Sequence, residues 1–258
     1  MKEVRDYYNT FQYPKVNLFT NKQKKKHTKL ILKILSYGNI TIKDIGQKKI
    51  LDAGCGTGEK SVFFAKNGAK VTAIDFTEKQ LVVAKDYAKR AEVSNKIIFK
   101  QKDIVNSNLK GLNKFNIIVC TGVLHHTEDA YKGFINLISV LEKNGIIIIA
   151  LYHKYARWKF RLIRFLLHLF VSKDFNKLDL WFEKNNFFAR LLKKAPNNSV
   201  YDRYLVPFES YHTLREVKGW FKKNNLKFIK NSKNVDGVEI FKIFEKKTLF
   251  FVSAQKNN

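Results

Sequence analysis

Four side chains that accept hydrogen bonds or move protons stand shortly after apolar runs of this sequence: Asp75, Asp103, His125 and His126. A carboxylate accepts hydrogen bonds from the hydroxyl or amino groups of a ligand. An imidazole titrates near neutral pH, so it can take a proton from a hydroxyl or an amine. These residue types at these positions indicate a site for a polar ligand, with histidine available as a general base.

A glycine-rich turn lies upstream of these residues. The short apolar run 49–53 leads into three glycines at alternate positions, Gly54, Gly56 and Gly58, and a helical pattern follows at once. Glycine lets the backbone turn sharply and approach a ligand without a Cβ atom in the way. The N–H groups at the start of the helix favour a carboxylate or another anion. A dinucleotide-binding fingerprint would need a glycine at the position of Glu59.

The elements that must position these residues alternate regularly between residues 46 and 151. Apolar runs that predict strands cover 49–53, 71–74, 97–99, 115–120 and 146–151. Helical patterns separate them, for example at 78–91 and 129–141. Apolar strands separated by helices predict a parallel sheet that is covered on both faces. Ligands of such sheets bind at the carboxyl ends of the strands, where all the candidate residues fall.

The spacing of Asp52, Gly54, Gly56 and Gly58 resembles the first motif of class I methyltransferases that depend on S-adenosylmethionine (SAM), in the small-molecule branch of types 11 and 12. The resemblance covers residues 46–151 through specific motifs and 201–258 through topology. It implies an α/β fold, a three-layer Rossmann-like sandwich with a seven-stranded, mostly parallel sheet whose last strand is antiparallel. It also implies SAM as the cofactor and S-adenosyl-L-homocysteine (SAH) as its product.

The resemblance implies a set of cofactor-binding residues at the strand ends. Asp75 is expected to accept from both ribose hydroxyls, with a helix N-cap as the alternative interpretation. Asp103 is expected to accept from the adenine amino group, with an ordinary loop aspartate as the alternative. The whole expected set is Asp52, Gly54, Gly56, Gly58, Asp75, Phe76, Asp103, Ile104, Thr121, Gly122 and His125.

The candidates for a catalytic base are His126, His153 and His212. His126 is the better candidate of the two neighbouring histidines to face the methyl acceptor, but the sequence does not determine which of them does so. A structural, hydrogen-bonded histidine is an equally good interpretation. A base is needed only where the acceptor arrives protonated. No third ligand stands at metal spacing from the pair, so no metal site is expected. The candidate acceptor-site residues are Tyr8, Tyr152, Tyr201, Asp202 and Tyr204.

We expect a single domain over residues 1–258. Its segments are an N-terminal helical segment (1–45), the SAM-binding core (46–151), an inserted helical cap (152–200) and a C-terminal helix with strands (201–258). In the cap, Arg157, Arg161, Arg164 and His168 share one helical face, and the rest of that helix is apolar. The pattern suits a helix buried on three sides, a lid over an apolar substrate, or a helix lying in a membrane interface.

The charge of the chain is strongly positive, with a formal net charge of +27. Such a charge favours nucleic acid, an anionic membrane surface or acidic substrates, but the excess of lysine is also typical of an AT-rich genome. No apolar stretch is long enough to span a membrane, and no signal-peptide pattern opens the chain. The two cysteines, Cys55 and Cys120, show no disulfide or metal spacing, so a cytoplasmic location is expected.

We therefore expect an enzyme that transfers a methyl group from SAM to oxygen or nitrogen of a small-molecule or lipid-like acceptor. The positive charge also allows nucleic acid as a partner and peripheral contact with a membrane. An RNA methyltransferase and a non-catalytic SAM-binding protein are the alternatives. The sequence leaves open the acceptor, the atom that is methylated, the use of a base, the oligomeric state and whether the charge has a function.

Overall fold

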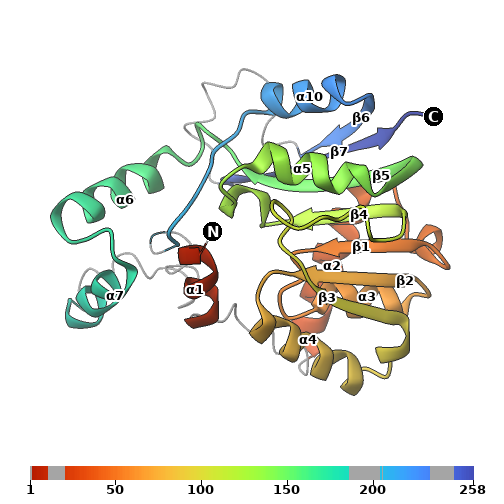
Figure 1. Cartoon of the computed structure of the whole chain (residues 1–258), viewed down its shortest axis with the longest axis horizontal. Helices are drawn as coiled ribbons and strands as arrows, with labels where there is room; N and C mark the ends of the chain where they lie inside the picture. The colour runs from red at the N-terminus through yellow and green to blue at the C-terminus, as the bar shows by residue number, and fades with distance from the viewer. Residues whose placement is uncertain (1, 11–20, 186–203, 205, 233–246) are drawn as a thin grey trace.

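The computed structural model describes residues 2–10, 21–185, 204, 206–232 and 247–258, and its elements form one sheet with helices around it (Figure 1). In chain order the elements are α1 (Lys2–Thr10), α2 (Asn21–Tyr37), η1 (Lys43–Ile45), β1 (Lys49–Ala53), α3 (Glu59–Lys66), β2 (Lys70–Asp75), α4 (Glu78–Arg90), η2 (Ser94–Lys96), β3 (Ile97–Gln101), β4 (Phe115–Thr121), η3 (Leu124–His126), α5 (Ala130–Ser139), β5 (Leu141–Tyr152), α6 (Trp158–Phe170), α7 (Phe175–Lys184), α10 (Leu214–Lys223), β6 (Leu226–Asn231) and β7 (Leu249–Lys256).

The sheet has seven strands in the order β3-β2-β1-β4-β5-β7-β6. The pairs β1–β2, β1–β4, β2–β3 and β4–β5 are parallel, and β7 is antiparallel to both of its neighbours. The strand order reverses between β1 and β4, which is where sheets of this kind bind ligands. The expected fold class, including the antiparallel last strand, is confirmed.

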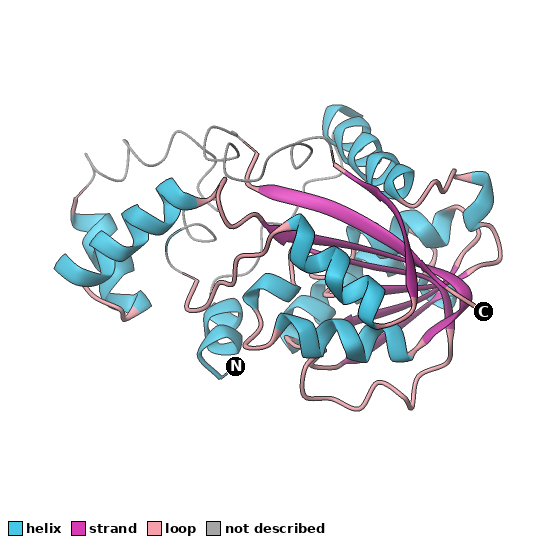
Figure 2. Cartoon of the chain, turned by 90° about the horizontal axis from the view of Figure 1, so that it is seen from above, coloured by secondary structure: helices cyan, strands magenta, loops and turns pink. Residues whose placement is uncertain are grey.

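Helices cover both faces of the sheet (Figure 2). Successive residues of a strand point to opposite faces, so Leu51 and Ile50 of β1 enter different cores. One core contains Leu51 with apolar side chains of α5 and α10, such as Phe134 and Phe221. The other contains Ile50 with side chains of α2, α3 and α4, such as Phe64. Residues 117–120 of β4 and 147–151 of β5 are apolar because both faces of the sheet are buried at its centre.

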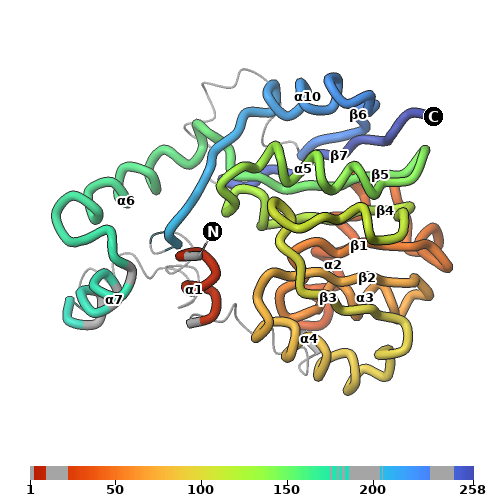
Figure 3. Tube along the Cα trace, in the orientation of Figure 1, coloured from red at the N-terminus to blue at the C-terminus, as the bar shows by residue number. Residues whose placement is uncertain are grey.

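The helices α6 and α7 extend from the edge of the sheet where β5 ends, on the same side as α1 (Figure 1). The described segment 206–213 runs from beside α1 to the start of α10 (Figure 3). A small apolar cluster joins these parts, formed by Tyr7, Leu167, Leu178, Tyr204 and Val206. The division of the chain into segments with an inserted cap stays a prediction.

One strand differs clearly from its expected bounds. β5 begins at Leu141, five residues before the expected start at 146, because Leu141 pairs with Phe115 of β4. Asn144 takes a left-handed backbone conformation within the strand, with φ 59°. The Asn144-Gly145 stretch therefore bends the strand instead of ending it. Among the described residues, no helix has both the length and the apolar content needed to cross a membrane.

Candidate functional site

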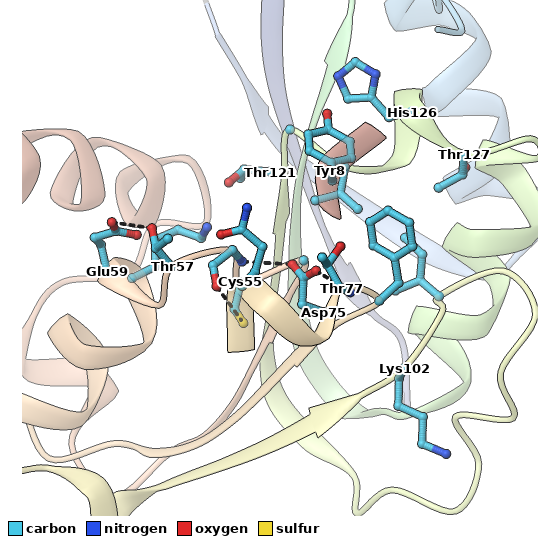
Figure 4. A pocket seen from close by; sticks show the side chains of 18 of the residues that line it. Tyr8, Cys55, Thr57, Glu59, Asp75, Thr77, Lys102, Thr121, His126 and Thr127 are labelled. Carbon is cyan, nitrogen blue, oxygen red and sulfur yellow. Dashed lines mark hydrogen bonds between the residues drawn. The ribbon is translucent and has the colours of Figure 1, made fainter. Parts of the chain in front are cut away.

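A cavity of about 300 Å³ lies at the carboxyl ends of β1, β2 and β4. The glycine turn after β1, the loop after β2, residues 102–104 after β3 and the η3 turn after β4 form its walls (Figure 4). Side chains of α1 and α2 complete the walls. It coincides with the reversal of strand order. Most of the residues expected at the site meet here, although they are far apart in the sequence.

The glycine turn requires glycine for two separate reasons. Gly54, Gly56 and Gly58 all have positive φ angles, of 71°, 54° and 83°. A Cβ atom on Gly54 would lie 2.2 Å from Cγ2 of Val123, so this position is needed for close packing. A Cβ atom on Gly56 would meet nothing within 4 Å, so this position leaves the backbone open toward the cavity.

Asp52 lies behind the turn rather than in the cavity wall. Its buried carboxylate accepts a hydrogen bond from Ser61 Oγ at 2.7 Å and lies 3.4 Å from Lys60 Nζ. Burial alone would lower the pKa of Lys60, but the negative charges of Asp52 and Glu59 outweigh it and raise the pKa. Asp52 thus holds the protonated Lys60 at the wall of the cavity. Its place behind the turn differs from the expected role as a direct ligand of the cofactor.

Asp75 ends β2 and lines the cavity. One carboxylate oxygen accepts from the backbone N–H of Thr77 and the other from that of Gly56, both at 2.9 Å. Burial raises the pKa of Asp75, and these two amide donors offset only part of the shift. Each oxygen keeps further lone-pair capacity, so the carboxylate can bind a ligand while it fixes the glycine turn.

Asp103 and Ile104 line the cavity at the end of β3. The carboxylate of Asp103 accepts from the backbone N–H groups of Val105 at 2.8 Å and Asn106 at 3.2 Å. Such hydrogen bonds are typical of an aspartate that stabilises a loop. Because Asp103 also lies in the cavity wall, its carboxylate is available to a ligand as well. Phe76, Thr121 and Gly122 line the cavity as well.

His126 lines the cavity together with Tyr8 of α1, and their ring centroids lie 6.3 Å apart (Figure 4). The Nδ1 atom of His126 lies 3.1 Å from the carbonyl oxygen of Phe208. A carbonyl oxygen can only accept, so Nδ1 carries the proton in the neutral ring. Nε2 is then the basic nitrogen of His126.

His125 does not line the cavity. Its ring is 1% exposed and packs against Tyr152, with ring centroids 3.7 Å apart. Burial lowers the pKa of His125 well below the usual 6.5, and the charges of His126 and Arg157 lower it further. The η3 turn therefore directs His126 to the cavity and His125 into the protein, which does not fit the expected place of His125 beside adenine.

Five further candidate residues also lie outside the cavity wall. One is Gly58, where a Cβ atom would lie 2.8 Å from Cβ of Ala84 in α4. His153 is buried, pairs with His212 through a single β-bridge and accepts from the backbone N–H of Ala156. His212 binds Ser210 through Nε2 and Glu216 through Nδ1, at the start of α10. Tyr152 and Tyr204 are buried in packing contacts. Tyr201 and Asp202 lie outside the described residues.

Several cavity residues were not expected from the sequence. They come from α2 and from the first turn of α3: His27, Leu30, Ile31, Ile34, Glu59 and Lys60. Burial lowers the pKa of His27 from 6.5, so this ring is neutral at pH 7. The apolar periodicity of α2 predicts a packed helix face, but periodicity alone does not say that this face also covers a ligand site.

A buried ion-pair network fixes the start of α6 near this site. Arg157 donates to both carboxylate oxygens of Glu209, through Nε at 3.2 Å and through Nη2. Tyr211 Oη donates to the same carboxylate at 2.7 Å, and Arg164 donates to the carbonyl of Pro207 at 2.9 Å. The Arg157 guanidinium also lies 3.4 Å from the ring centroid of Tyr152. The segment that supplies the Phe208 carbonyl to His126 is thereby held in place.

The cavity fits the chemical groups of SAM. An open backbone at Gly56 and the carboxylates of Asp75 and Asp103 suit hydroxyl and amino donors, and Lys60 suits a carboxylate. Apolar side chains of α1 and α2, including Val4 and Ile31, cover the polar wall. Among the described residues, no group of three or more His, Cys, Asp or Glu side chains could hold a metal ion.

The family model described as "Methyltransferase domain" matches residues 46–177, about half of the chain. A curated relative, the ubiquinone biosynthesis O-methyltransferase of Rickettsia canadensis, is 29% identical over 189 residues, which are 73% of this chain and 67% of the relative. The chain spans between 28% and 67% of the length of the first curated relatives that it matches.

Solved structures share the fold. The magnesium protoporphyrin IX methyltransferase of Synechocystis PCC 6803 with bound SAH aligns over 99% of both chains, with a TM-score of 0.62 and 17% identity. The N-methyltransferase NodS of Bradyrhizobium japonicum, also with SAH, aligns over 99% of this chain and 100% of its own, with a TM-score of 0.57 and 12% identity. At these identities the likeness establishes the architecture.

Proposed function

The chain belongs to the methyltransferase domain family and shares its fold with solved structures that hold SAM or SAH, and we propose that it methylates oxygen or nitrogen of a small-molecule or lipid-like acceptor. The observation that carries the proposal is the cavity at the reversal of strand order, which brings together the glycine turn, Asp75, Asp103 and His126. These groups suit the cofactor at one part of the cavity and an acceptor at another.

The proposed cofactor contacts combine the roles that the family resemblance implies with the places of these residues in the cavity wall. Asp75 would accept from the ribose hydroxyls, Asp103 and Ile104 would bind the adenine, and the backbone at Gly56 and Gly122 would lie against the rest of the molecule. SAM supplies a methyl group on a sulfonium that is already a good leaving group. Lys60 and the N-terminus of α3 suit the carboxylate of the cofactor.

The chain's own contribution to catalysis is positioning, exclusion of water and removal of a proton. The buried apolar side chains Val4, Ile31 and Ile34 would exclude water from part of the cavity. A dry site that aligns two reactants accounts for much of the acceleration in such reactions. Nε2 of His126 would take the proton of an acceptor hydroxyl or amine. Tyr8, which lies beside His126, would contact the acceptor.

The acceptor class rests on the relatives. Their names include an O-methyltransferase of ubiquinone biosynthesis, a methyltransferase that acts on magnesium protoporphyrin IX, and an N-methyltransferase. These names support a small-molecule acceptor with a reactive oxygen or nitrogen.

We propose a cytoplasmic location for the protein. The net charge of +27 is the observation that favours RNA as a second candidate acceptor.

The test is a transfer assay with methyl-tritiated SAM, the full-length protein and two substrate sources, a lipid-containing metabolite extract and purified RNA. We expect label in the organic-soluble or the small polar fraction, because side chains of α1 and α2 cover the cavity. Label in RNA alone, lost steeply as salt rises, would replace the proposal by the RNA methyltransferase. Binding of SAH without any transfer from either source would favour a non-catalytic SAM-binding protein.

A further inference from the structure

The helix α6 exposes a continuous apolar stripe. Trp158, Leu162, Phe165, Leu166, Leu169 and Phe170 are all exposed, from 41% for Trp158 to 78% for Phe170. Residues of an α-helix follow one another at about 100° of rotation, which places these six within an arc of about 140°. Large apolar side chains scattered singly over a surface are ordinary, but a stripe of six on one helix marks an interaction surface.

The opposite face of α6 explains why the stripe points outward. Arg157, just before the helix, and Arg164 turn toward the body of the protein, where Arg157 binds the buried Glu209 and Arg164 binds the Pro207 carbonyl. Leu167 of the same face packs with Tyr7 and Leu178. These contacts fix the rotation of the helix, so the basic residues that share a face in the sequence do not form an exposed stripe. The interpretation of α6 as a helix buried on three sides is wrong.

Positive charge accompanies the stripe. Lys159 and Arg161 are exposed near its two edges, and α6 contains no acidic residue. Residues 173–184, in and beside α7, contain three lysines and three acidic residues and add no net charge. An apolar stripe with basic borders is the pattern of a helix that lies in the interface of an anionic membrane, with its apolar side chains among the acyl chains and its cations at the phosphates.

We propose that the apolar stripe of α6, residues 158, 162, 165, 166, 169 and 170, docks on an anionic lipid bilayer. Charge complementarity selects this occupant, because the stripe has basic borders on a chain of net charge +27. Figure 1 shows α6 and α7 on the same side of the sheet as α1, which covers the cavity. Docking through α6 would therefore bring the cavity side of the protein to the membrane. The inference concerns an interaction surface and holds for any acceptor.

The test is flotation of the full-length protein with vesicles of phosphatidylcholine that contain about 30% phosphatidylglycerol, compared with phosphatidylcholine alone. The wild type is expected to float with the anionic vesicles. Phe165→Ser combined with Leu169→Ser should lower the partition coefficient by at least about tenfold, because it removes the two side chains at the centre of the stripe. Arg161→Gln should lower it by about fivefold on anionic vesicles only.

The matched control combines Val82→Ser with Ile98→Ser, which removes two equally exposed apolar side chains from α4 and β3. The control should bind vesicles like the wild type. Equal binding by the Phe165/Leu169 variant would mean that net charge alone adsorbs the protein, and it would overturn the proposal. If the wild type is a dimer that binds no vesicles, and the Phe165/Leu169 variant is a monomer, the stripe contacts a second copy of the chain instead of a membrane. Vesicle binding and SAH binding are separate readouts, so failure of the proposed function leaves this test intact.

Discussion

The two neighbouring histidines of the η3 turn have opposite environments. His126 lies in the cavity wall with Nδ1 bound to the Phe208 carbonyl, while His125 is buried against Tyr152. Sequence order brings both residues to the end of β4, but it does not fix which ring faces the cavity. The rotation of a single short turn decides it, and that rotation depends on Phe208 and Ser210, which bind the turn from more than 80 residues away.

His126→Gln is expected to lower kcat by about 100-fold while the affinity for SAH stays within about twofold. The glutamine keeps a polar side chain of similar length but cannot take a proton at Nε2. The transfer rate is measured with the substrate fraction that becomes labelled in the assay with methyl-tritiated SAM, and the affinity is measured by titration with SAH. His168→Gln, a substitution outside the cavity, serves as the control and should retain the wild-type rate. An unchanged kcat in His126→Gln would exclude this residue as the base.

His125 makes stability depend on pH. Its folded-state pKa lies well below 6.5, so below pH 6.5 the unfolded chain binds a proton at His125 that the folded chain does not. The free energy of unfolding should therefore fall as pH decreases from 7 to 5, by up to about 1.4 kcal/mol per pH unit from this residue. Urea unfolding at several pH values measures it. His27 and His168, whose pKa values are also lowered, contribute in the same direction.

The matched variant is His125→Phe, which keeps a ring against Tyr152 and cannot titrate. Its free energy of unfolding should depend less steeply on pH over the same range, with the remaining slope due to the other histidines. If the slope of His125→Phe equals that of the wild type, His125 is not the buried neutral group that the structure describes.

At the scale of elements, apolar runs and strand-end residues predict the core of the fold well. The five strands expected between residues 49 and 151 are present, because strands at the centre of the sheet are buried on both faces and leave a clear apolar pattern in the sequence. The outward rotation of α6 could not be predicted in the same way. It depends on Glu209, which lies 52 residues after its partner Arg157, and nothing in the local periodicity of α6 shows this contact.

Gly54→Ala is expected to destabilise the protein by at least about 2 kcal/mol, because an L-residue there needs a left-handed backbone and its Cβ would lie 2.2 Å from Val123. Urea unfolding measures the loss. Val123→Ala added to Gly54→Ala should restore part of it by removing the clash. Gly219→Ala in α10, where a Cβ meets nothing within 4 Å, should raise the stability slightly. A neutral Gly54→Ala would refute the close packing of the turn.

Glu209→Gln is expected to cost about 3 kcal/mol of unfolding free energy, because it leaves the buried guanidinium of Arg157 without its carboxylate. The double variant with Arg157→Gln should be more stable than Glu209→Gln alone, since neither side chain is then a buried, unpaired charge. Urea unfolding of the single and double variants gives the coupling energy. A coupling energy near zero would mean that the pair does not anchor the start of α6.

At the scale of the whole molecule, three properties come together on one side of the sheet. The cavity lies at the carboxyl ends of β1, β2 and β4, α1 covers it, and α6 carries its apolar stripe nearby (Figure 1). Composition alone could not separate a functional positive charge from a general excess of lysine. The placement of Lys159 and Arg161 beside exposed apolar residues supplies the information that the total charge lacks.

A calorimetric titration of SAH into the wild type and Asp75→Ala tests whether this cavity binds the cofactor. We expect the wild type to bind and the variant to bind at least about tenfold more weakly, a loss of about 1.4 kcal/mol. Asp86→Ala, which removes an exposed carboxylate of α4, should bind like the wild type. Absence of binding by the wild type, or equal affinity in Asp75→Ala, would contradict the assignment of this cavity as the SAM site.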